Sequence, residues 1–181
     1  MNIRIATIKD AKEICEIYKY YVENTHISFE YIAPTVQEFE IRIANTLENY
    51  PYIVCEVDGK IVGYSYASRH MERASYSWNA VMTVYVDKNE RGCGIGSELY
   101  RRLIEILQRQ NIKNVYGIIT SGNDKSIAMH QKIGFKINAV YHNAGFKNGK
   151  WLDVTWVEKN ISEYDVPPKE FVPFREICKE F

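Results

Sequence analysis

Apolar residues recur at helical spacing near the start of the chain and predict two amphipathic helices. In the first, apolar residues three and four positions apart form one stripe, which is typical of a helix packed on a sheet. That stripe consists of Ile8, Ala11, Ile14, Cys15, Tyr18 and Val22. The second helix is predicted to begin at Thr35, because the sequence Thr-Val-Gln-Glu forms a capping box, and to end before Pro51.

Strand-like runs follow these two helices. The runs 52–57 and 60–68 are predicted to form a hairpin, since the Asp58-Gly59 pair between them suits a two-residue turn. Another strand is predicted over 76–86. Three successive strands with so short a first connection indicate an antiparallel run.

The second half of the chain alternates helices and strands. A helix is predicted over 95–109, a buried strand over 114–120, and a helix over 123–133 that ends at Gly134. The final strands, 135–146 and 150–158, turn at Asn148-Gly149. The expected fold is therefore α/β, with a mixed sheet that helices cover on both faces.

Composition narrows the class of partner. The chain has 181 residues, of which 46% are hydrophobic, so one compact domain is expected. Twenty-three basic residues balance 23 acidic ones, which leaves no net field to attract nucleic acid or an anionic membrane. The fourteen tyrosines therefore fit sheet and pocket walls better than a base-stacking platform. These observations predict that the partner is a small molecule.

Cysteine spacing and hydropathy indicate the compartment. The four cysteines lie far apart, with no Cys-x-x-Cys pair to suggest a metal, so neither zinc nor a disulfide framework is expected. The first residues contain no apolar export signal, and no apolar run is long enough to span a bilayer. A cytoplasmic protein with reduced thiols is expected.

A glycine-rich loop lies between the strand ending at Val86 and the helix over 95–109. Its sequence is Arg91-Gly-Cys-Gly-Ile-Gly-Ser97. Glycines let a ligand approach the backbone, and free amides at a helix N-terminus bind anions, so the loop is predicted to hold phosphates. Neither a Gly-Lys-Ser/Thr sequence nor an acidic residue about 20 positions on supports a nucleotide P-loop or a dinucleotide site. The alternative is that the glycines only make a tight turn.

Polar residues interrupt the inward stripe of the helix over 123–133. Asn123, Ser126 and His130, three and four positions apart, share this face with Ile127 and Ile133. Buried polar groups need partners, so these three are candidates for a cleft. The alternative is that Asn123 caps the helix and that His130 is a core histidine.

These features together resemble the GNAT acyltransferase superfamily. The family's acetyl-CoA motif is Arg or Gln, two variable residues, Gly, one variable residue, and Gly or Ala, which Arg91, Gly94 and Gly96 match after a strand. The resemblance extends to the phosphinothricin N-acetyltransferase-like branch and reaches about Glu158. The segments that match that branch are 27–30, 73–78, 123–130, 133–135 and 145–153.

The resemblance implies a fold and a cofactor site. The implied fold is a mixed, mostly antiparallel sheet of six to seven strands, with helices on both faces and a splay between two central parallel strands. Residues 1–160 are expected to form this domain, with 161–181 as a C-terminal extension packed on it. The residues implied to bind acetyl-CoA are Val84, Tyr85, Val86, Arg91, Gly92, Cys93, Gly94, Ile95, Gly96, Ser97, Asn123 and Ser126.

The implied chemistry is direct transfer of acetyl to a primary amine. A strand amide near Tyr85 or Val86 is expected to stabilise the oxyanion, and His130 is expected to protonate the leaving thiolate. Where the branch has a glutamate as general base, this chain has Val81, which cannot accept a proton. Water held by Glu30, Asn79 or Tyr85 is one substitute, with Glu30 as the candidate catalytic residue. The alternatives are that the amine arrives with a lower pKa or that the acceptor differs from that of the branch.

The implied acceptor is a small polar amine, such as phosphinothricin or methionine sulfoximine. Its expected contacts are Phe29, Arg73, Ser75 and Tyr76, with Arg73 binding a carboxylate. The alternatives are another metabolite amine, a peptide N-terminus, or a catalytically silent acyl-CoA-binding module. The resemblance also suggests a homodimer.

Overall fold

The computed structural model describes the backbone of residues 1–181 and all side chains except that of residue 180. One seven-stranded sheet runs through the molecule, in the order β1-β2-β3-β4-β5-β7-β6. All neighbouring strands are antiparallel except β4 and β5. The strands are β1 (Asn2–Ile5), β2 (Tyr52–Val57), β3 (Lys60–Arg69), β4 (Asn79–Val86), β5 (Asn114–Thr120), β6 (Lys136–Lys147) and β7 (Lys150–Asn160). The predicted mixed sheet is thereby confirmed.

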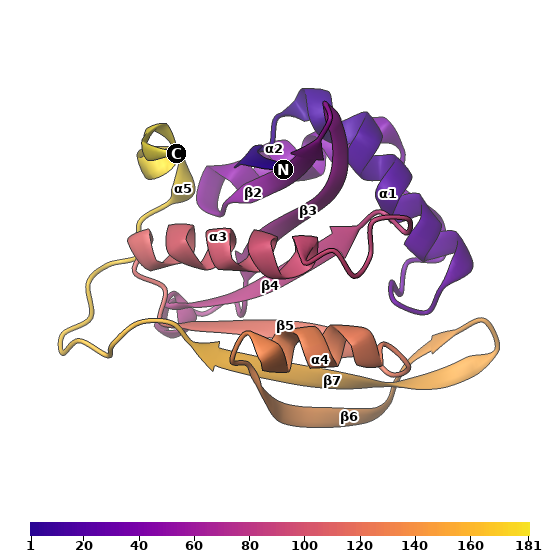
Figure 1. The fold of residues 1–181 in the computed structure, drawn as a ribbon. Helices are drawn as coiled ribbons and strands as arrows, with labels where there is room; N and C mark the ends of the chain where they lie inside the picture. Colours follow the sequence, from indigo (N-terminus) through magenta and orange to yellow (C-terminus); the bar gives the residue numbers. More distant parts are fainter.

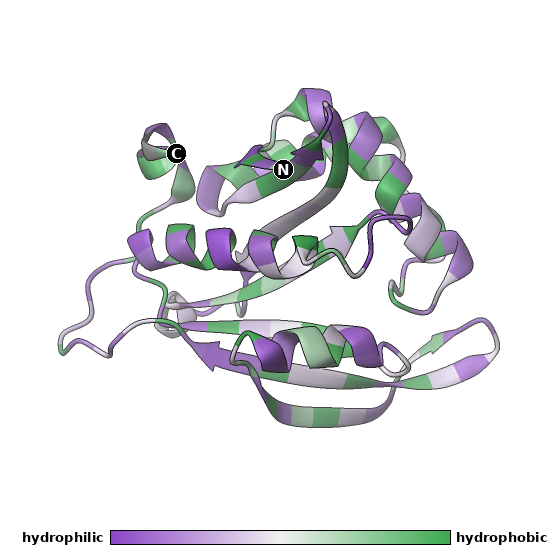
Figure 2. Cartoon of the chain, viewed as in Figure 1, coloured by the Kyte–Doolittle hydropathy of each residue, from purple (hydrophilic) through white to green (hydrophobic). Residues whose placement is uncertain are grey.

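Helices cover both faces of this sheet (Figure 1). They are α1 (Ala11–Asn24), α2 (Val36–Asn49), α3 (Ile95–Arg109), α4 (Asp124–Lys132) and the short α5 (Phe174–Ile177). Adjacent residues of β2 point to opposite faces: Ile53 joins the core under α3, and Tyr52 and Val54 join the core under α1 and α2. Along α3, hydrophobic and hydrophilic residues alternate within each turn (Figure 2), and the buried residues share one face, as the apolar stripe predicted.

The parallel strands β4 and β5 separate after a short contact. Their register covers only residues 79–81 of β4 and 114–116 of β5, although β4 remains paired with β3 as far as Val86. The side chains of Tyr100 and His130 lie where the strands part. The Tyr100 hydroxyl donates to the Met82 carbonyl at 3.0 Å, and His130 Nε2 lies 3.3 Å from that hydroxyl. The predicted splay is therefore present, with two aromatic side chains at its base.

Several local predictions are confirmed at atomic detail. The Thr35 capping box forms, with the Glu38 amide donating to Thr35 Oγ1 at 3.2 Å and the Thr35 amide donating to Glu38 Oε2 at 2.6 Å. Both predicted hairpin turns have the positive φ angles that their sequences suit. The strand predicted over 76–86 is shorter than expected, because residues 74–76 form a 3-10 helix and β4 begins at Asn79.

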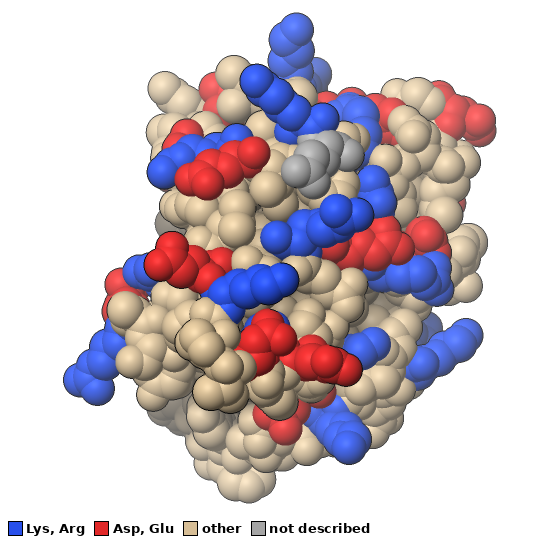
Figure 3. Space-filling view, turned by 90° about the vertical axis from the view of Figure 1, so that its left-hand side faces the viewer, with Lys and Arg blue, Asp and Glu red and all other residues tan. Residues whose placement is uncertain are grey.

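The C-terminal segment packs against the ends of α2, α3 and β5. Phe174 is 1% exposed, Lys113 Nζ lies 2.7 Å from an Asp165 carboxylate oxygen, and Trp78 Nε1 donates to the Lys169 carbonyl at 2.6 Å. Basic and acidic side chains are interspersed on the side of the molecule shown in Figure 3. None of the helices in the described part of the chain combines the length and hydropathy needed to cross a bilayer.

Candidate active site

The loop between β4 and α3 has a conformation that only glycine adopts easily. Gly92 and Gly94 have φ angles of 86° and 82°, in the left-handed region, and Gly94 is the N-cap of α3. A Cβ atom built on either glycine meets nothing within 4 Å, so the loop faces open space. Close approach of a ligand to this backbone is therefore sterically allowed.

The amides of this loop are free to bind an anion. The first α3 amide with a main-chain acceptor is that of Glu98, which donates to the Gly94 carbonyl at 3.1 Å. Within the described chain, the amides of residues 92–97 have no acceptor. Converging free amides at the positive end of a helix dipole suit a phosphate group.

The edge of β4 that faces the splay offers main-chain groups of Val84 and Val86 that do not pair with a strand. Main-chain groups alternate between the two edges of a strand. The carbonyls of Met82 and Val86 face the splay, where they accept from the hydroxyls of Tyr100 and Tyr21 at 3.0 and 2.5 Å. Val84, between them, presents its N–H and C=O to the same opening. The Tyr85 carbonyl lies on the β3 side, beside Gly63, so its amide does not face the splay.

Helix α4 lies close to the start of α3 on the same face of the sheet. A Cβ atom on Gly96 would lie 2.9 Å from Met129 Sδ, so glycine at this position lets the two helices approach. Asn123 is the N-cap of α4, and Ser126 is half-buried one turn later. Across the loop, the Arg91 guanidinium lies 5.0 Å from the centre of the Tyr21 ring. The start of α3 therefore lies against α4, and Arg91 lies against α1.

His130 is buried at the base of the splay, with 2% of its surface exposed. Its Nδ1 lies 2.7 Å from the Ser126 carbonyl. A carbonyl can only accept, so Nδ1 carries the proton and Nε2 presents its lone pair toward the Tyr100 hydroxyl. Burial lowers the pKa of His130, although the bond to Ser126 opposes this. The ring is therefore neutral near pH 7.

A cavity of about 410 Å³ opens on the other face of the sheet, beside the splay. Its walls come from α1, the loop after α1, and strands β4, β5 and β7. The lining residues are Tyr18, Ile27, Ser28, Phe29, Glu30, Tyr85, Ile118, Thr120 and Val154. Two predicted residues, Phe29 and Glu30, therefore reach the splay from the face opposite the glycine loop.

Glu30 is held by two donors in this cavity. Its Oε1 accepts from the Tyr18 hydroxyl at 2.9 Å and from Arg42 Nη1 at 2.8 Å, and its Oε2 accepts from Arg42 Nη2 at 3.2 Å. Burial and the neighbouring Glu30 raise the pKa of Tyr18 to about 12, so its hydroxyl remains a donor at neutral pH. A carboxylate has about four lone-pair sites, which leaves one free on Oε2.

The loop that carries Glu30 is anchored by a buried lysine. Lys147, at the end of β6, is 2% exposed, and its Nζ donates to the carbonyls of Val22 and Ser28 at 2.7 Å each. The Tyr31 hydroxyl also donates to the Phe146 carbonyl. Sequence reasoning did not identify Lys147 as an anchor, since a lysine near a hairpin turn normally faces solvent.

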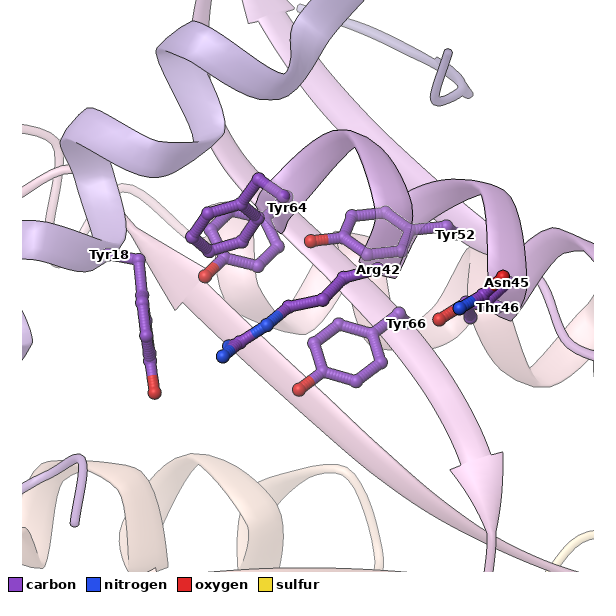
Figure 4. A pocket seen from close by; sticks show the side chains of 8 residues that line it. Tyr18, Arg42, Asn45, Thr46, Tyr52, Tyr64 and Tyr66 are labelled. Atoms are coloured by element: carbon purple, nitrogen blue, oxygen red, sulfur yellow. The ribbon is translucent and has the colours of Figure 1, made fainter. Parts of the chain in front are cut away.

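A second cavity, of about 290 Å³, lies between α2 and the sheet (Figure 4). It shares Tyr18 with the first cavity. Its lining residues are Tyr18, Phe39, Arg42, Asn45, Thr46, Tyr52, Tyr64 and Tyr66. The rings of Tyr52 and Tyr66 stack at 5.0 Å, and those of Tyr52 and Tyr64 at 5.8 Å. The tyrosine content indicated aromatic pocket walls, but the sequence did not show which tyrosines meet.

The other predicted acceptor residues lie elsewhere. Arg73, Ser75 and Tyr76 are exposed before β4, at the end where β4 and β5 remain paired, and none lines either cavity. Val81 faces neither cavity, and its partner in β5 is Tyr116. Across the described chain, no group of three His, Cys, Asp or Glu side chains is arranged to hold a metal ion.

Comparison with known proteins shows the family. A family model described as the acetyltransferase (GNAT) domain matches residues 3–156. A phosphinothricin N-acetyltransferase from Streptomyces viridochromogenes is 32% identical over 177 residues, which cover 98% of this chain and 96% of that protein. An L-methionine sulfoximine/L-methionine sulfone acetyltransferase from Salmonella typhimurium is 30% identical over 168 residues, which cover 92% and 98%.

A solved structure agrees with this assignment. The GNAT superfamily phosphinothricin acetyltransferase from Sinorhizobium meliloti, in complex with acetyl-CoA, superposes with a TM-score of 0.88 at 28% identity, covering 96% of each chain. The splay, the loop of free amides and these matches agree. The chain belongs to the GNAT family of acetyltransferases, with acetyl-CoA as co-substrate.

Proposed function

We propose that this enzyme acetylates the primary amine of a small amino-acid analogue of the phosphinothricin or methionine sulfoximine type. The row of unpaired amides over residues 92–97, beside the open edge of β4, carries this proposal. These donors fit the diphosphate of acetyl-CoA. The names of two relatives support the acceptor class.

The free amides and the open edge of β4 support the following assignment of the cofactor side of the splay. The amides of Gly92, Cys93, Gly94, Ile95, Gly96 and Ser97 bind the diphosphate, and Arg91 adds positive charge beside them. The edge of β4 at Val84 pairs with the pantetheine arm as an added strand. Asn123 and Ser126 contact the cofactor from α4. When bound, acetyl-CoA supplies a thioester carbonyl that is activated for attack by an amine.

The reaction places the amine on the opposite face of the sheet. Glu30 accepts a proton from the acceptor ammonium, directly or through one water, and the amine nitrogen then forms a bond to the acetyl carbon. The amide of Val84 or Val86, both on the splay side of β4, stabilises the developing oxyanion. As the carbon–sulfur bond breaks, the nitrogen releases its second proton. His130, which is neutral at rest, takes that proton at Nε2 and delivers it to the leaving sulfur, so that coenzyme A leaves as the free thiol and Glu30 returns its proton to water.

Phe29 packs against the acceptor in the larger cavity. Arg73, Ser75 and Tyr76 line neither cavity, and we propose them as contacts only for an acceptor that is long enough to reach the start of β4. Exposed apolar side chains on β6 and β7 favour a homodimer in which these two strands form the interface. They are Ile137, Val140, Tyr141, Phe146 and Trp151. Sedimentation velocity of the native protein and of Trp151→Glu tests this assembly. We place the enzyme in the cytoplasm.

A panel assay tests the proposed function. The enzyme is incubated with acetyl-CoA and each of a set of amines: phosphinothricin, methionine sulfoximine, methionine sulfone, a polyamine and a peptide. Release of free thiol and the mass of the product are measured. Turnover with the amino-acid analogues supports the proposal. Binding of acetyl-CoA without thiol release for any amine would instead identify an acyl-CoA-binding module.

A further inference from the structure

The smaller cavity contains polar groups that the proposed reaction does not use. Tyr52 is 2% exposed, and its hydroxyl has no hydrogen-bond partner among the described residues. A buried polar atom without a partner is costly, and most such groups are satisfied by a ligand or an ordered water. An unsatisfied hydroxyl in a cavity wall therefore points to an occupant.

Three polar groups in the wall of this cavity extend toward the same residue. Figure 4 shows the hydroxyls of Tyr52 and Tyr66 and the guanidinium of Arg42 all extending toward Tyr18. Tyr18 is the residue that the two cavities share. The polar groups thus gather at the junction with the larger cavity, while the aromatic rings form the walls behind them.

Arg42 has donors to spare at this junction. A guanidinium has five N–H groups, and Glu30 uses one on each Nη atom, which leaves three. The Arg42 side chain also lies over the Phe39 ring, with its Cζ 5.5 Å from the ring centre, which restricts its motion. This fixed fork matches a carboxylate, which guanidinium groups bind through paired hydrogen bonds.

We propose that Arg42, with the Tyr52 hydroxyl, binds the α-carboxylate of the acceptor, so that the Glu30–Arg42 pair recognises an α-amino acid by both of its charges. Glu30 takes the ammonium and Arg42 the carboxylate, while the acceptor side chain lies along the wall of Tyr64 and Tyr66. This inference rests on the proposed function. It replaces Arg73 by Arg42 as the carboxylate-binding residue.

Position relative to the splay supports the assignment. An ammonium at Glu30 lies in the cavity that Tyr85 of β4 and Thr120 of β5 also line, which is the acceptor side of the splay. The Tyr18 ring, at the junction, lies 5.0 Å from the Tyr85 ring. Arg73 lines neither cavity. Arg42 is the cation in direct contact with Glu30, at 2.8 Å, whereas the Lys147 ammonium is taken up by the Val22 and Ser28 carbonyls.

The test compares two acceptors that differ only in the carboxylate. These are L-methionine sulfone and 3-(methylsulfonyl)propylamine, the same molecule without its α-carboxylate. For Arg42→Gln, we expect the ratio of the KM of the amino acid to that of the amine to rise at least about tenfold, because only the amino acid loses charge-assisted hydrogen bonds. Any effect through Glu30, which Arg42 also holds, is common to both acceptors and cancels in this ratio. For Tyr52→Phe, we expect a rise of about threefold for the amino acid alone.

Matched substitutions control for general damage. Tyr50→Phe changes a buried tyrosine outside the cavity, and Arg102→Gln changes an exposed arginine that pairs with Glu105 on α3. Neither should change the KM ratio of the two acceptors. Calorimetric titration of L-methionine sulfone into the enzyme without acetyl-CoA gives a second readout, in which Arg42→Gln should lose binding and Tyr50→Phe should retain it.

The outcomes separate this inference from the proposed function. If the wild type acetylates both acceptors and Arg42→Gln affects both equally or neither, the inference fails and the proposed function stands. If Arg73→Gln changes the ratio and Arg42→Gln does not, Arg73 binds the carboxylate and the inference is wrong. If no amine is acetylated, the proposed function fails. The titration of L-methionine sulfone then decides by itself whether Arg42 binds the carboxylate. Absence of amino-acid binding there would show that the cavity holds only water.

Discussion

The base of the splay makes a quantitative prediction about Gly117 of β5. A Cβ atom at this position would lie 2.8 Å from His130 Nε2, 3.2 Å from His130 Cδ2 and 2.9 Å from Val157 Cγ2. Both neighbours are buried, with exposures of 2% and 0%, so neither can move away freely. Overpacking a core by one methyl group costs about 1–3 kcal/mol. Replacing a strand glycine by alanine otherwise gains about 0.5–1 kcal/mol.

The expected net effect of Gly117→Ala is destabilisation by about 1.3 kcal/mol, the difference between the midpoints of these two ranges. For a chain of this size, that corresponds to a fall in Tm of about 3–5 °C. Urea denaturation followed by circular dichroism measures the free energy of unfolding. The same substitution in a His130→Ala background should cost at least about 0.5 kcal/mol less, because one of the two contacts is gone. Equal costs in both backgrounds, or a Gly117→Ala protein as stable as wild type, would refute the packing of His130 against this strand.

Four further predictions follow from the site. Gly94→Ala should weaken acetyl-CoA binding about tenfold in a calorimetric titration, because alanine at a φ of 82° strains the amide cradle, and an unchanged Kd would contradict the phosphate assignment. His130→Phe should lower kcat far more than it raises the Kd of acetyl-CoA, whereas equal losses would make the residue a packing element. Lys147→Met should destabilise the fold by about 1–3 kcal/mol and raise the acceptor KM, since two buried carbonyls lose their donor, and wild-type values for both would exclude an anchoring role. Burial lowers the pKa of His130 and of His70, so the unfolded chain binds protons first as the pH falls. The Tm should therefore drop as the pH falls below about 6.5, and this drop should be less steep in His130→Phe. Identical slopes of Tm against pH in the two proteins would argue against a buried neutral His130 ring.

The sequence determined the parts of this protein that depend on neighbouring residues. The capping box at Thr35 and the turn at Asp58-Gly59 form as predicted, because each depends on contacts within four residues. The glycine loop was recognisable for the same reason. Its free amides follow from a strand, two left-handed glycines and a helix in direct succession. Family resemblance then supplied the expected splay between the two parallel strands.

Only the tertiary structure decided which distant side chains meet. The periodicity of β2 and β3 assigns tyrosines to one face of the sheet but does not say that Arg42 of α2 lies across them and pairs with Glu30. It likewise leaves open whether His130 is exposed or buried. The structure shows that Gly117 makes room for that ring and that Tyr100 reaches it from another helix. The physical reason is that alternation fixes the face on which a side chain lies, whereas its partner depends on how remote segments pack on that face.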